Sequence, residues 1–354
     1  NWSFTSGGPG GACVPTAGDD VFFDANSFNA ANSVVTINVE NAYCRSMDWT
    51  GATGNPRLEG TVEQNIRIFG SLTFIANMQL PFAGNFYFEG SSPGNTITSA
   101  GKVLRRDAVF NGSGDWTLLD DFEAETDIIL MQGRLNSNDQ TVTCQLFDAR
   151  FPSARALSMG SSTFVLRYLQ TNNKQRSYVL WQATSTNFQL DAGTSTIDFQ
   201  FFGFMYHYGE PPLNYNRIIT RRWIDFRNQG ENFSAVTQPV FIDYQTTETE
   251  GRYFGHHVIN RWELTPAYAH QIGRRDTLTV TEIIAPVICE GMIEIRCVED
   301  DDIAYFIATQ DQTIENFILK DVHSIGPGTV TANNSVDLGN TDGWVINDRA
   351  PRDL

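Results

Sequence analysis

The sequence predicts an all-β fold, a right-handed parallel β-helix in which short strands stack coil upon coil. Two observations predict it: the composition is typical of a turn-rich β protein, and a strand-plus-glycine unit recurs about every twenty residues. The 354 residues include 29 glycines and 25 phenylalanines, and stretches with helical periodicity and caps are absent. A single coil cannot bury its inward side chains alone, so coils must stack. The hand is expected to be right because parallel crossovers are overwhelmingly right-handed.

The repeat is marked by glycines that each follow a short β-prone run. These glycines are Gly51, Gly70, Gly90, Gly112 and Gly133, at spacings of 19, 20, 22 and 21 residues. A second register appears where residues 157–164 (LSMGSSTF) are echoed 33 residues later by residues 190–197 (LDAGTSTI). With parallel strands ~4.8 Å apart, the chain is expected to form roughly eight to twelve stacked coils.

Two other architectures fit a period near twenty less well. Leucine-rich repeats need a regular leucine ladder, which this sequence lacks. A β-sandwich with irregular hairpins stays open as the alternative, although Asn-Gly hairpin signals between alternating strands are scarce.

The composition changes in the second half of the chain. Residues 199–226 hold nine aromatic residues, residues 217–275 hold eight arginines, and the glycine period is lost there. We therefore expect β-helix coils with an N-terminal cap over residues 1–202, and an elaborated aromatic and arginine-rich segment of the same solenoid over 203–276. C-terminal coils are expected over 277–347, and a polar linker to a missing downstream domain over 348–354.

Charge and hydropathy exclude two classes of partner. The net charge is −17, and a surface that negative repels nucleic-acid backbones. No run of 18 or more apolar residues exists, so a membrane-spanning helix is not expected.

Several short motifs carry a resemblance to a known class of proteins. They are Asn1-Trp2-Ser3, Cys13-Val14-Pro15, residues 18–28 (GDDVFFDANSF), residues 44–51, residues 70–73 (GSLT), residues 94–98 (GNTIT), Leu264-Thr265-Pro266 and residues 334–344. This set is similar to the amino-terminal repeat regions of very large, gliding-motility-associated or adhesin-like surface proteins of Bacteroidota. The resemblance implies type IX secretion, an extracellular, cell-surface location and a sorting domain at a distant carboxyl terminus, and it supplies no catalytic residues.

The expected function is therefore an extracellular structural and adhesive module that displays or spaces binding surfaces, in adhesion or gliding. The partners would be surface glycans, other cell-surface proteins and downstream domains of the same polypeptide. We do not expect an enzyme and assign no catalytic residue. Three alternatives stay open: a glycan-binding module, a polysaccharide lyase or hydrolase built on a β-helix, and a subunit of a surface filament.

The aromatic and arginine-rich segment is the best candidate binding site. Sugars present flat apolar faces that stack on aromatic rings, and polar edges that suit arginine, aspartate and asparagine. The candidate glycan-binding residues are Tyr206, Tyr208, Tyr215, Trp223, Tyr253 and Trp262. The alternative is that these side chains fill the core of a widened coil or contact a neighbouring domain.

No cofactor is expected, although Ca²⁺ is a candidate ligand. Carboxylates cluster at Asp19-Asp20, Asp120-Asp121 and residues 299–302, and Ca²⁺ prefers several oxygen ligands. A charge run of this kind is more often a solvated turn. The adjacent His256 and His257 lack zinc-binding spacing, and on a strand they would point to opposite faces.

Five cysteines are too few for a disulfide scaffold, but two pairs are candidate disulfides in an oxidising exterior. Cys13 and Cys44 flank the first coils, where a bridge would secure a cap. Cys289 and Cys297 are eight residues apart and could link neighbouring segments. Cys144 would then be a small buried hydrophobe.

Overall fold

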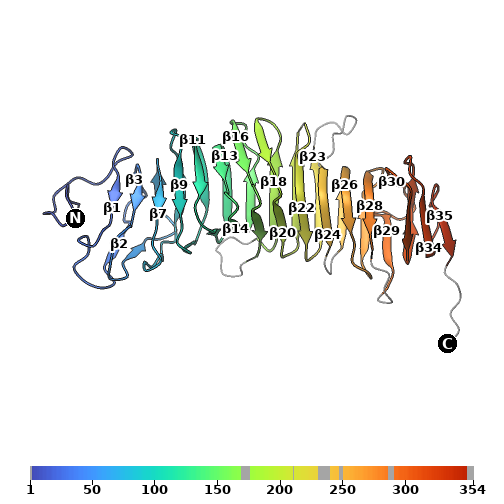
Figure 1. Ribbon diagram of the computed structural model, residues 1–354, viewed down its shortest axis with the longest axis horizontal. Helices are drawn as coiled ribbons and strands as arrows, with labels where there is room; N and C mark the ends of the chain where they lie inside the picture. The colour runs from blue at the N-terminus through green and yellow to red at the C-terminus, as the bar shows by residue number, and fades with distance from the viewer. Residues whose placement is uncertain are drawn as a thin grey trace. The chain divides into compact units, whose positions relative to one another are not determined.

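The computed structural model describes residues 2–168, 176–209, 211–229, 240–246, 250–285 and 291–348. In this part of the chain the regular elements are β-strands, and parallel strands stack as a β-solenoid of about 13 turns (Figure 1). The predicted all-β, parallel β-helix is confirmed, with more turns than expected. The β-sandwich alternative is excluded because the named strands pair in parallel, whereas the hand of the coil stays a prediction.

The chain forms two compact units. Unit 1 comprises Asn1–Ser177 and Asn187–Gly193, and unit 2 comprises Tyr178–Thr186 and Thr194–Leu354. The described residues of 203–276, expected as an elaborated segment, form strands in the same parallel mode as the rest of unit 2. Of the expected linker over 348–354, only Asp348 is among the described residues, as the last residue of a strand.

The strands of unit 1 are short, and most have two to four residues. They are β1 (Val21–Phe22), β2 (Val34–Thr36), β3 (Asn41–Cys44), β4 (Met47–Asp48), β5 (Arg57–Glu59), β6 (Asn65–Ile68), β7 (Leu72–Thr73), β8 (Asn85–Phe88), β9 (Asn95–Thr98), β10 (Val103–Leu104), β11 (Ala108–Leu118), β12 (Phe122–Ala124), β13 (Asp127–Asn136), β14 (Thr141–Cys144), β15 (Leu146–Ala149), β16 (Arg155–Ser158), β17 (Thr163–Leu166) and β19 (Phe188–Asp191).

The strands of unit 2 are longer on average. They are β18 (Val179–Thr184), β20 (Thr196–Phe199), β21 (Gly203–Tyr208), β22 (Asn214–Thr220), β23 (Ile224–Gln229), β24 (Val240–Thr246), β25 (Gly251–Phe254), β26 (His256–Glu263), β27 (Ala269–Ile272), β28 (Thr277–Ile284), β29 (Ile293–Cys297), β30 (Ala304–Ala308), β31 (Gln312–Glu315), β32 (Phe317–Lys320), β33 (Val322–Ser324), β34 (Val330–Asp337) and β35 (Val345–Asp348).

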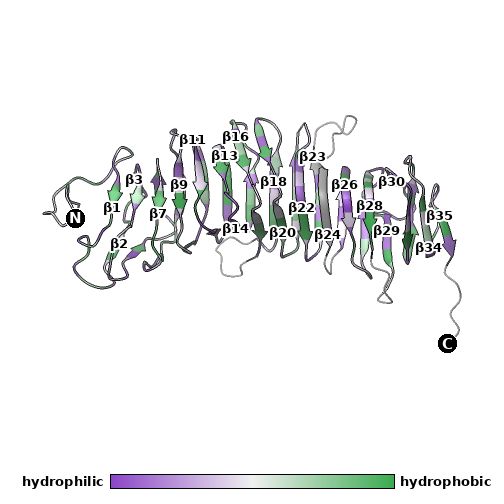
Figure 2. Ribbon diagram, viewed as in Figure 1, coloured by the Kyte–Doolittle hydropathy of each residue, from purple (hydrophilic) through white to green (hydrophobic). Residues whose placement is uncertain are grey.

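Side chains alternate between the core and the surface along these strands, because successive residues of a strand face opposite sides of a sheet. In β6 the apolar Ile66 and Ile68 are buried, while Asn65 and Arg67 are half-buried on the other side. Figure 2 shows the corresponding stripes of hydrophobic and hydrophilic residues. Like residues then stack from coil to coil: Phe88 lies on Phe110 with ring centroids 4.8 Å apart. The core therefore consists of columns of stacked side chains, and each column runs from one coil to the next.

Glycine recurs in unit 1 because the backbones of successive coils approach too closely for a side chain. A Cβ added at Gly112 would lie 2.2 Å from the carbonyl oxygen of Gly90, and one added at Gly133 would lie 2.1 Å from that of Gly112. The second register has the same cause, since a Cβ at Gly193 would lie 2.3 Å from the carbonyl oxygen of Gly160. From Gly90 to Gly133 the sequence period is therefore a column of stacked glycines, whereas a Cβ at Gly51 would meet nothing within 4 Å and one at Gly70 would meet Ser46 and Arg45.

Aromatic packing, without a disulfide, holds the first coils. The rings of Phe23 and Trp49 stack with centroids 3.9 Å apart, and Trp2 lies 5.9 Å from Phe23. Cys13 is exposed and Cys44 is buried, and both are free thiols, so the prediction of a bridge between them was wrong. The physical reason is that Cys44 ends β3 with its side chain in the core.

The second predicted bridge falls partly on residues outside the description. Cys297 ends β29 with a buried, free thiol, and Cys289 lies outside the described residues. Cys144 is buried, as expected of a small hydrophobe, and burial raises the pKa of its thiol.

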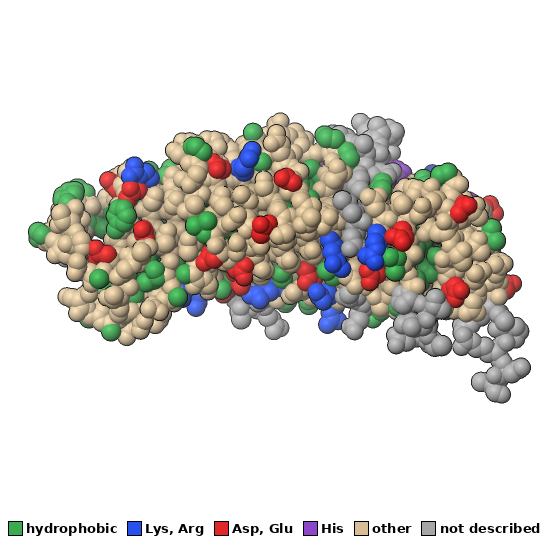
Figure 3. Space-filling view, in the orientation of Figure 1, with side chains coloured by type: hydrophobic (Ala, Val, Ile, Leu, Met, Phe, Trp, Pro, Cys, Tyr) green, Lys and Arg blue, Asp and Glu red, His purple; other side chains and the backbone are tan. Residues whose placement is uncertain are grey.

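Charged side chains are spread over the surface. On the face drawn in Figure 3, acidic and basic side chains are interspersed, and no single-sign patch dominates. Many of them pair locally, as Arg67 does with Glu89 at 2.7 Å. Pairs of this exposure contribute little to stability.

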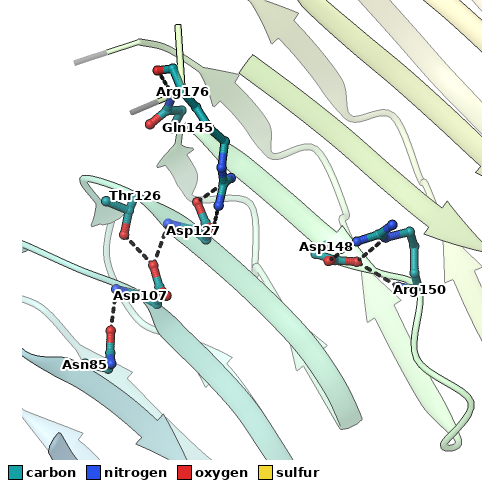
Figure 4. A network of polar contacts seen from close by, with 8 residues as sticks. All are labelled: Asn85, Asp107, Thr126, Asp127, Gln145, Asp148, Arg150 and Arg176. Carbon is teal, nitrogen blue, oxygen red and sulfur yellow. Dashed lines mark hydrogen bonds and ion pairs between the residues drawn. The ribbon is translucent and has the colours of Figure 1, made fainter. Parts of the chain in front are cut away.

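A polar ladder runs across the coils of unit 1 where the strands of one row begin. Asn65 donates from Nδ2 to Oδ1 of Asn41 at 3.2 Å, and Asn85 donates in the same way to Asn65 at 3.1 Å. The Asp107 backbone N–H then donates to Oδ1 of Asn85, and Asp127 N–H donates to the Asp107 carboxylate (Figure 4). The ladder satisfies side-chain polar groups at successive coils and holds the coils in register.

Candidate binding face

The outward row of β21 is aromatic. Gly203, Met205 and His207 are buried, whereas Phe204 and Tyr206 alternate with them and are half-buried on the outer side, as is Tyr208 at the end of the strand. Strict alternation over six residues produces this arrangement. The three aromatic side chains of β21, Phe204, Tyr206 and Tyr208, therefore all lie on its outer side.

The neighbouring strands β23 and β25 add arginines to this row. Arg227 of β23 lies in register with Tyr206, and Phe254 of β25 lies in register with Arg227. Arg252 of β25 lies in register with Asp225 of β23. We define the aromatic–arginine face as the outer side chains of these strands and the residue before β23: Phe204, Tyr206, Tyr208, Trp223, Arg227, Arg252 and Phe254.

Four rings of the face, those of Phe204, Tyr206, Tyr208 and Trp223, form one connected cluster. Phe204 lies 5.5 Å from Tyr206 and meets Trp223 edge to face at 5.8 Å between centroids. Tyr206 meets Tyr208 edge to face at 6.3 Å. Edge-to-face contacts are favourable for aromatic pairs and fix the ring orientations. The cluster is therefore a continuous apolar platform held by its own packing.

Both arginines of the face lie over aromatic rings. The guanidinium of Arg227 is 4.9 Å from the ring centroid of Phe254, and that of Arg252 is 5.0 Å from the centroid of Trp223. A planar guanidinium over a ring gains cation–π attraction and keeps its edge free for hydrogen bonds. The arrangement presents positive charge beside flat apolar surfaces.

Asp225 lies beneath these side chains and organises them. Its side chain is 1% exposed, and its Oδ2 accepts a hydrogen bond from Nη2 of Arg227 at 2.7 Å. Burial raises the pKa of this carboxyl group, and Arg227 and Arg252 act in the opposite direction. Arg252, by contrast, forms no ion pair with any residue that the structure describes.

The six predicted glycan-binding residues divide between two environments. Tyr206, Tyr208 and Trp223 lie together on the aromatic–arginine face, half-buried. Tyr215, Tyr253 and Trp262 are almost fully buried, so they fill the core, which was the alternative interpretation. Tyr215, for example, accepts a hydrogen bond from the indole N–H of Trp181 at 3.2 Å.

The predicted set of glycan-binding residues omitted four members of the face: Phe204, Arg227, Arg252 and Phe254. Phe204 and Phe254 were not chosen as ligand-binding residues, and Arg252 was not singled out at all. The signal that could have identified Phe204 is the alternation of Gly-Phe-Met-Tyr-His-Tyr in residues 203–208. For Phe254 and Arg252 the necessary information is the register of β25 against β23, which is a tertiary feature.

The acidic clusters considered for Ca²⁺ are used within the chain. Asp20 pairs with Arg45, and Asp120 accepts the backbone N–H of Ser99 at 2.7 Å. Asp300 pairs with Lys320 at 2.6 Å. Within the described residues, no group of three or more histidine, cysteine or acidic side chains is arranged to hold a metal ion.

Two arginines of the aromatic and arginine-rich segment, Arg217 and Arg221, have partners elsewhere in the chain. Arg217 donates to Oε1 of Gln245 at 2.7 Å, and Arg221 forms a two-point ion pair with Asp198. Both arginines therefore take part in hydrogen bonds and ion pairs that support the fold.

Comparison with known proteins finds no matching family model, no matching curated protein and no matching solved structure. No segment of the described chain forms a helix with the length and apolarity that crossing a membrane requires. The chemistry of the aromatic–arginine face is therefore the basis on which a function can be proposed.

Proposed function

We propose that the chain is an extracellular structural and adhesive module, a β-solenoid that carries a carbohydrate-binding face. The observation that supports this most directly is the aromatic–arginine face, in which half-buried rings and guanidinium groups lie side by side on three neighbouring strands. Sugar rings stack on aromatic faces, and their hydroxyl groups accept hydrogen bonds from arginine. Polar rim groups around an apolar platform are typical of ligand sites.

The adhesive part of the proposal follows from how the face is supported. The face belongs to strands whose opposite side chains pack in the solenoid core, including Met205, Phe226 and Tyr253. Sites built on strands hold their side chains more firmly than sites on loops. The extracellular location at the surface of a bacterium, with type IX secretion, derives from the sequence resemblance.

A glycan array tests this proposal. We expect the wild-type chain to bind at least one class of glycan, and Trp223→Ala and Tyr206→Ala to lose that signal. The matched control is Tyr87→Ala, because Tyr87 is also a half-buried tyrosine under an arginine, with Arg67 at 4.3 Å, but lies in unit 1. Equal signals from wild type and Trp223→Ala would remove the face from the proposal.

A further inference from the structure

We infer that the aromatic–arginine face binds an acidic polysaccharide, with a uronic acid as the charged sugar. This inference rests on the proposed function and specifies the ligand class. Neutral glycans need only the aromatic platform, whereas the structure supplies more positive charge at the face than the face itself neutralises.

The charge at the face differs from that of the chain as a whole. The chain has a net charge of −17, yet the face carries two arginines above one aspartate, Asp225. Asp225 contacts Arg227, and Arg252 has no ion pair among the described residues. Arg222, which precedes Trp223, and Glu250, which precedes β25, are both exposed and carry opposite charges. The face therefore retains a positive charge that an anionic ligand can neutralise.

Both arginines are held in place by the rings they lie on, and Arg252 is the one that has no ion pair among the described residues. Stacking on Trp223 and on Phe254 restricts Arg252 and Arg227, so that less side-chain entropy is lost on binding. A guanidinium edge matches the two oxygens of a carboxylate, and such charge-assisted pairs are about twice as strong as neutral hydrogen bonds. The carboxylate of a uronic acid is fixed to the sugar ring, which would stack beside it.

The strand register extends the polar row beyond the face. Arg252 of β25 lies in register with Gln271 of β27, which lies in register with Arg296 of β29. At ~4.8 Å per strand, Arg252 and Arg296 are ~9.6 Å apart along the stack. Arg296 is partly neutralised by Glu294 at 3.6 Å. Gln271 itself is buried, so Arg252 and Arg296 are the accessible donors of this row, and two arginines at this separation suit a polymer that crosses several strands rather than a single sugar.

Single-stranded nucleic acid is the other polyanion that uses aromatic rings and arginines. Its phosphates repeat at every nucleotide, and it requires a groove with continuous positive potential. The face has a single arginine without an ion pair, in a chain of strongly negative charge, so the acidic polysaccharide fits better.

Isothermal titration with defined polymers tests the inference. The probes are polygalacturonate, its methyl ester, in which the same sugars lack the charge, and oligothymidylate. We expect wild-type chain to bind polygalacturonate at least about tenfold more tightly than the ester, with affinity falling as salt rises. Arg252→Gln should lose about tenfold in affinity for polygalacturonate, the effect of one charge-assisted contact.

The matched control is Arg261→Gln. Arg261 is a half-buried arginine on β26 of the same unit, but it is paired with Glu263 at 3.3 Å and does not belong to the face. The Arg261→Gln variant should bind polygalacturonate with the same affinity as the wild-type chain. Circular dichroism melting of each variant establishes that the solenoid is intact.

The outcomes separate the inference from the proposed function. Equal affinity for the acid and its ester, equal affinity of Arg252→Gln and Arg261→Gln, or tighter binding of oligothymidylate would each overturn the acidic-polysaccharide inference. If neutral glycans bind and Trp223→Ala abolishes that binding, the inference fails while the carbohydrate-binding proposal stands. If no carbohydrate binds to wild type, both are overturned.

Discussion

Unit 1 and unit 2 share parallel strand pairing. They differ in the residue types that occupy the outer sides of their strands and the positions between strands. Unit 1 has columns of stacked glycines and an asparagine ladder, as at Gly112 and Asn65. Unit 2 has aromatic and arginine side chains outside, as at Tyr206 and Arg252, whereas bulky aromatic residues fill the core of both units. The pairing of the backbone is therefore independent of the side chains that occupy the outer rows.

The largest expected loss of stability comes from a substitution in the glycine column of unit 1. In Gly112→Ala the new Cβ would meet the carbonyl oxygen of Gly90 at 2.2 Å, and backbone cannot move aside as a flexible side chain can. We expect the free energy of unfolding to fall by about 3 kcal/mol, measured by urea denaturation. In the control Gly18→Ala the new Cβ lies 3.8 Å from the nearest atom, Thr16 Oγ1. Similar losses in the two variants would contradict the explanation of the repeat.

The next effect concerns the aromatic core of unit 2. His270 is fully buried beside Trp262, at 5.2 Å between ring centroids, and burial lowers its pKa to about 3. The folded state holds it neutral, whereas the unfolded chain protonates it below its ordinary value of 6.5. Stability should therefore fall as the pH drops below 6.5 and level off only below about 3.

The contribution of His270 between pH 7 and pH 5 is about 2 kcal/mol. His257, whose pKa burial lowers to about 4, should add a loss of the same sign. Urea denaturation across this pH range measures the slope, and His270→Gln should reduce it relative to wild type. An unchanged slope would show that this imidazole does not resist protonation in the folded chain.

The smallest expected effect tests the asparagine ladder. Asn65→Ala removes the hydrogen bond to Asn41 and leaves Nδ2 of Asn85 without its acceptor. These groups are partly exposed to water, so the loss should be about 1 kcal/mol in urea denaturation. If Asn65→Ala lowers the free energy of unfolding as much as Gly112→Ala does, the ladder stabilises unit 1 as strongly as the glycine column.

The repeat and the fold class could be predicted because they follow from backbone constraints that sequence records directly. A position that admits no Cβ must be glycine, so Gly90, Gly112 and Gly133 show the period without knowledge of any contact. The same reasoning could not place Cys44, because its side chain direction depends on the register of β3 within its coil.

The sequence could predict which segment carries the candidate site, but not which side of each strand its residues occupy. Tyr206 and Tyr253 are both tyrosines in aromatic runs, yet one faces outward and the other inward. On β22 the alternation is interrupted, since Asn216 and Arg217 are both half-buried, so the burial of Tyr215 could not be derived by counting along the strand. Which side of a strand meets the core is decided by its neighbours in the stack.

The column of glycines constrains how a chain of this kind can change. At each of these glycines, the carbonyl group of the preceding winding lies where the Cβ of any other residue would be. The carbonyl group of Gly90 lies there at Gly112, and that of Gly112 lies there at Gly133. Duplication of a whole winding would reproduce both the vacancy and the group that fills it. Lengthening by duplication is therefore compatible with this geometry, whereas replacement of one winding by an unrelated sequence is not.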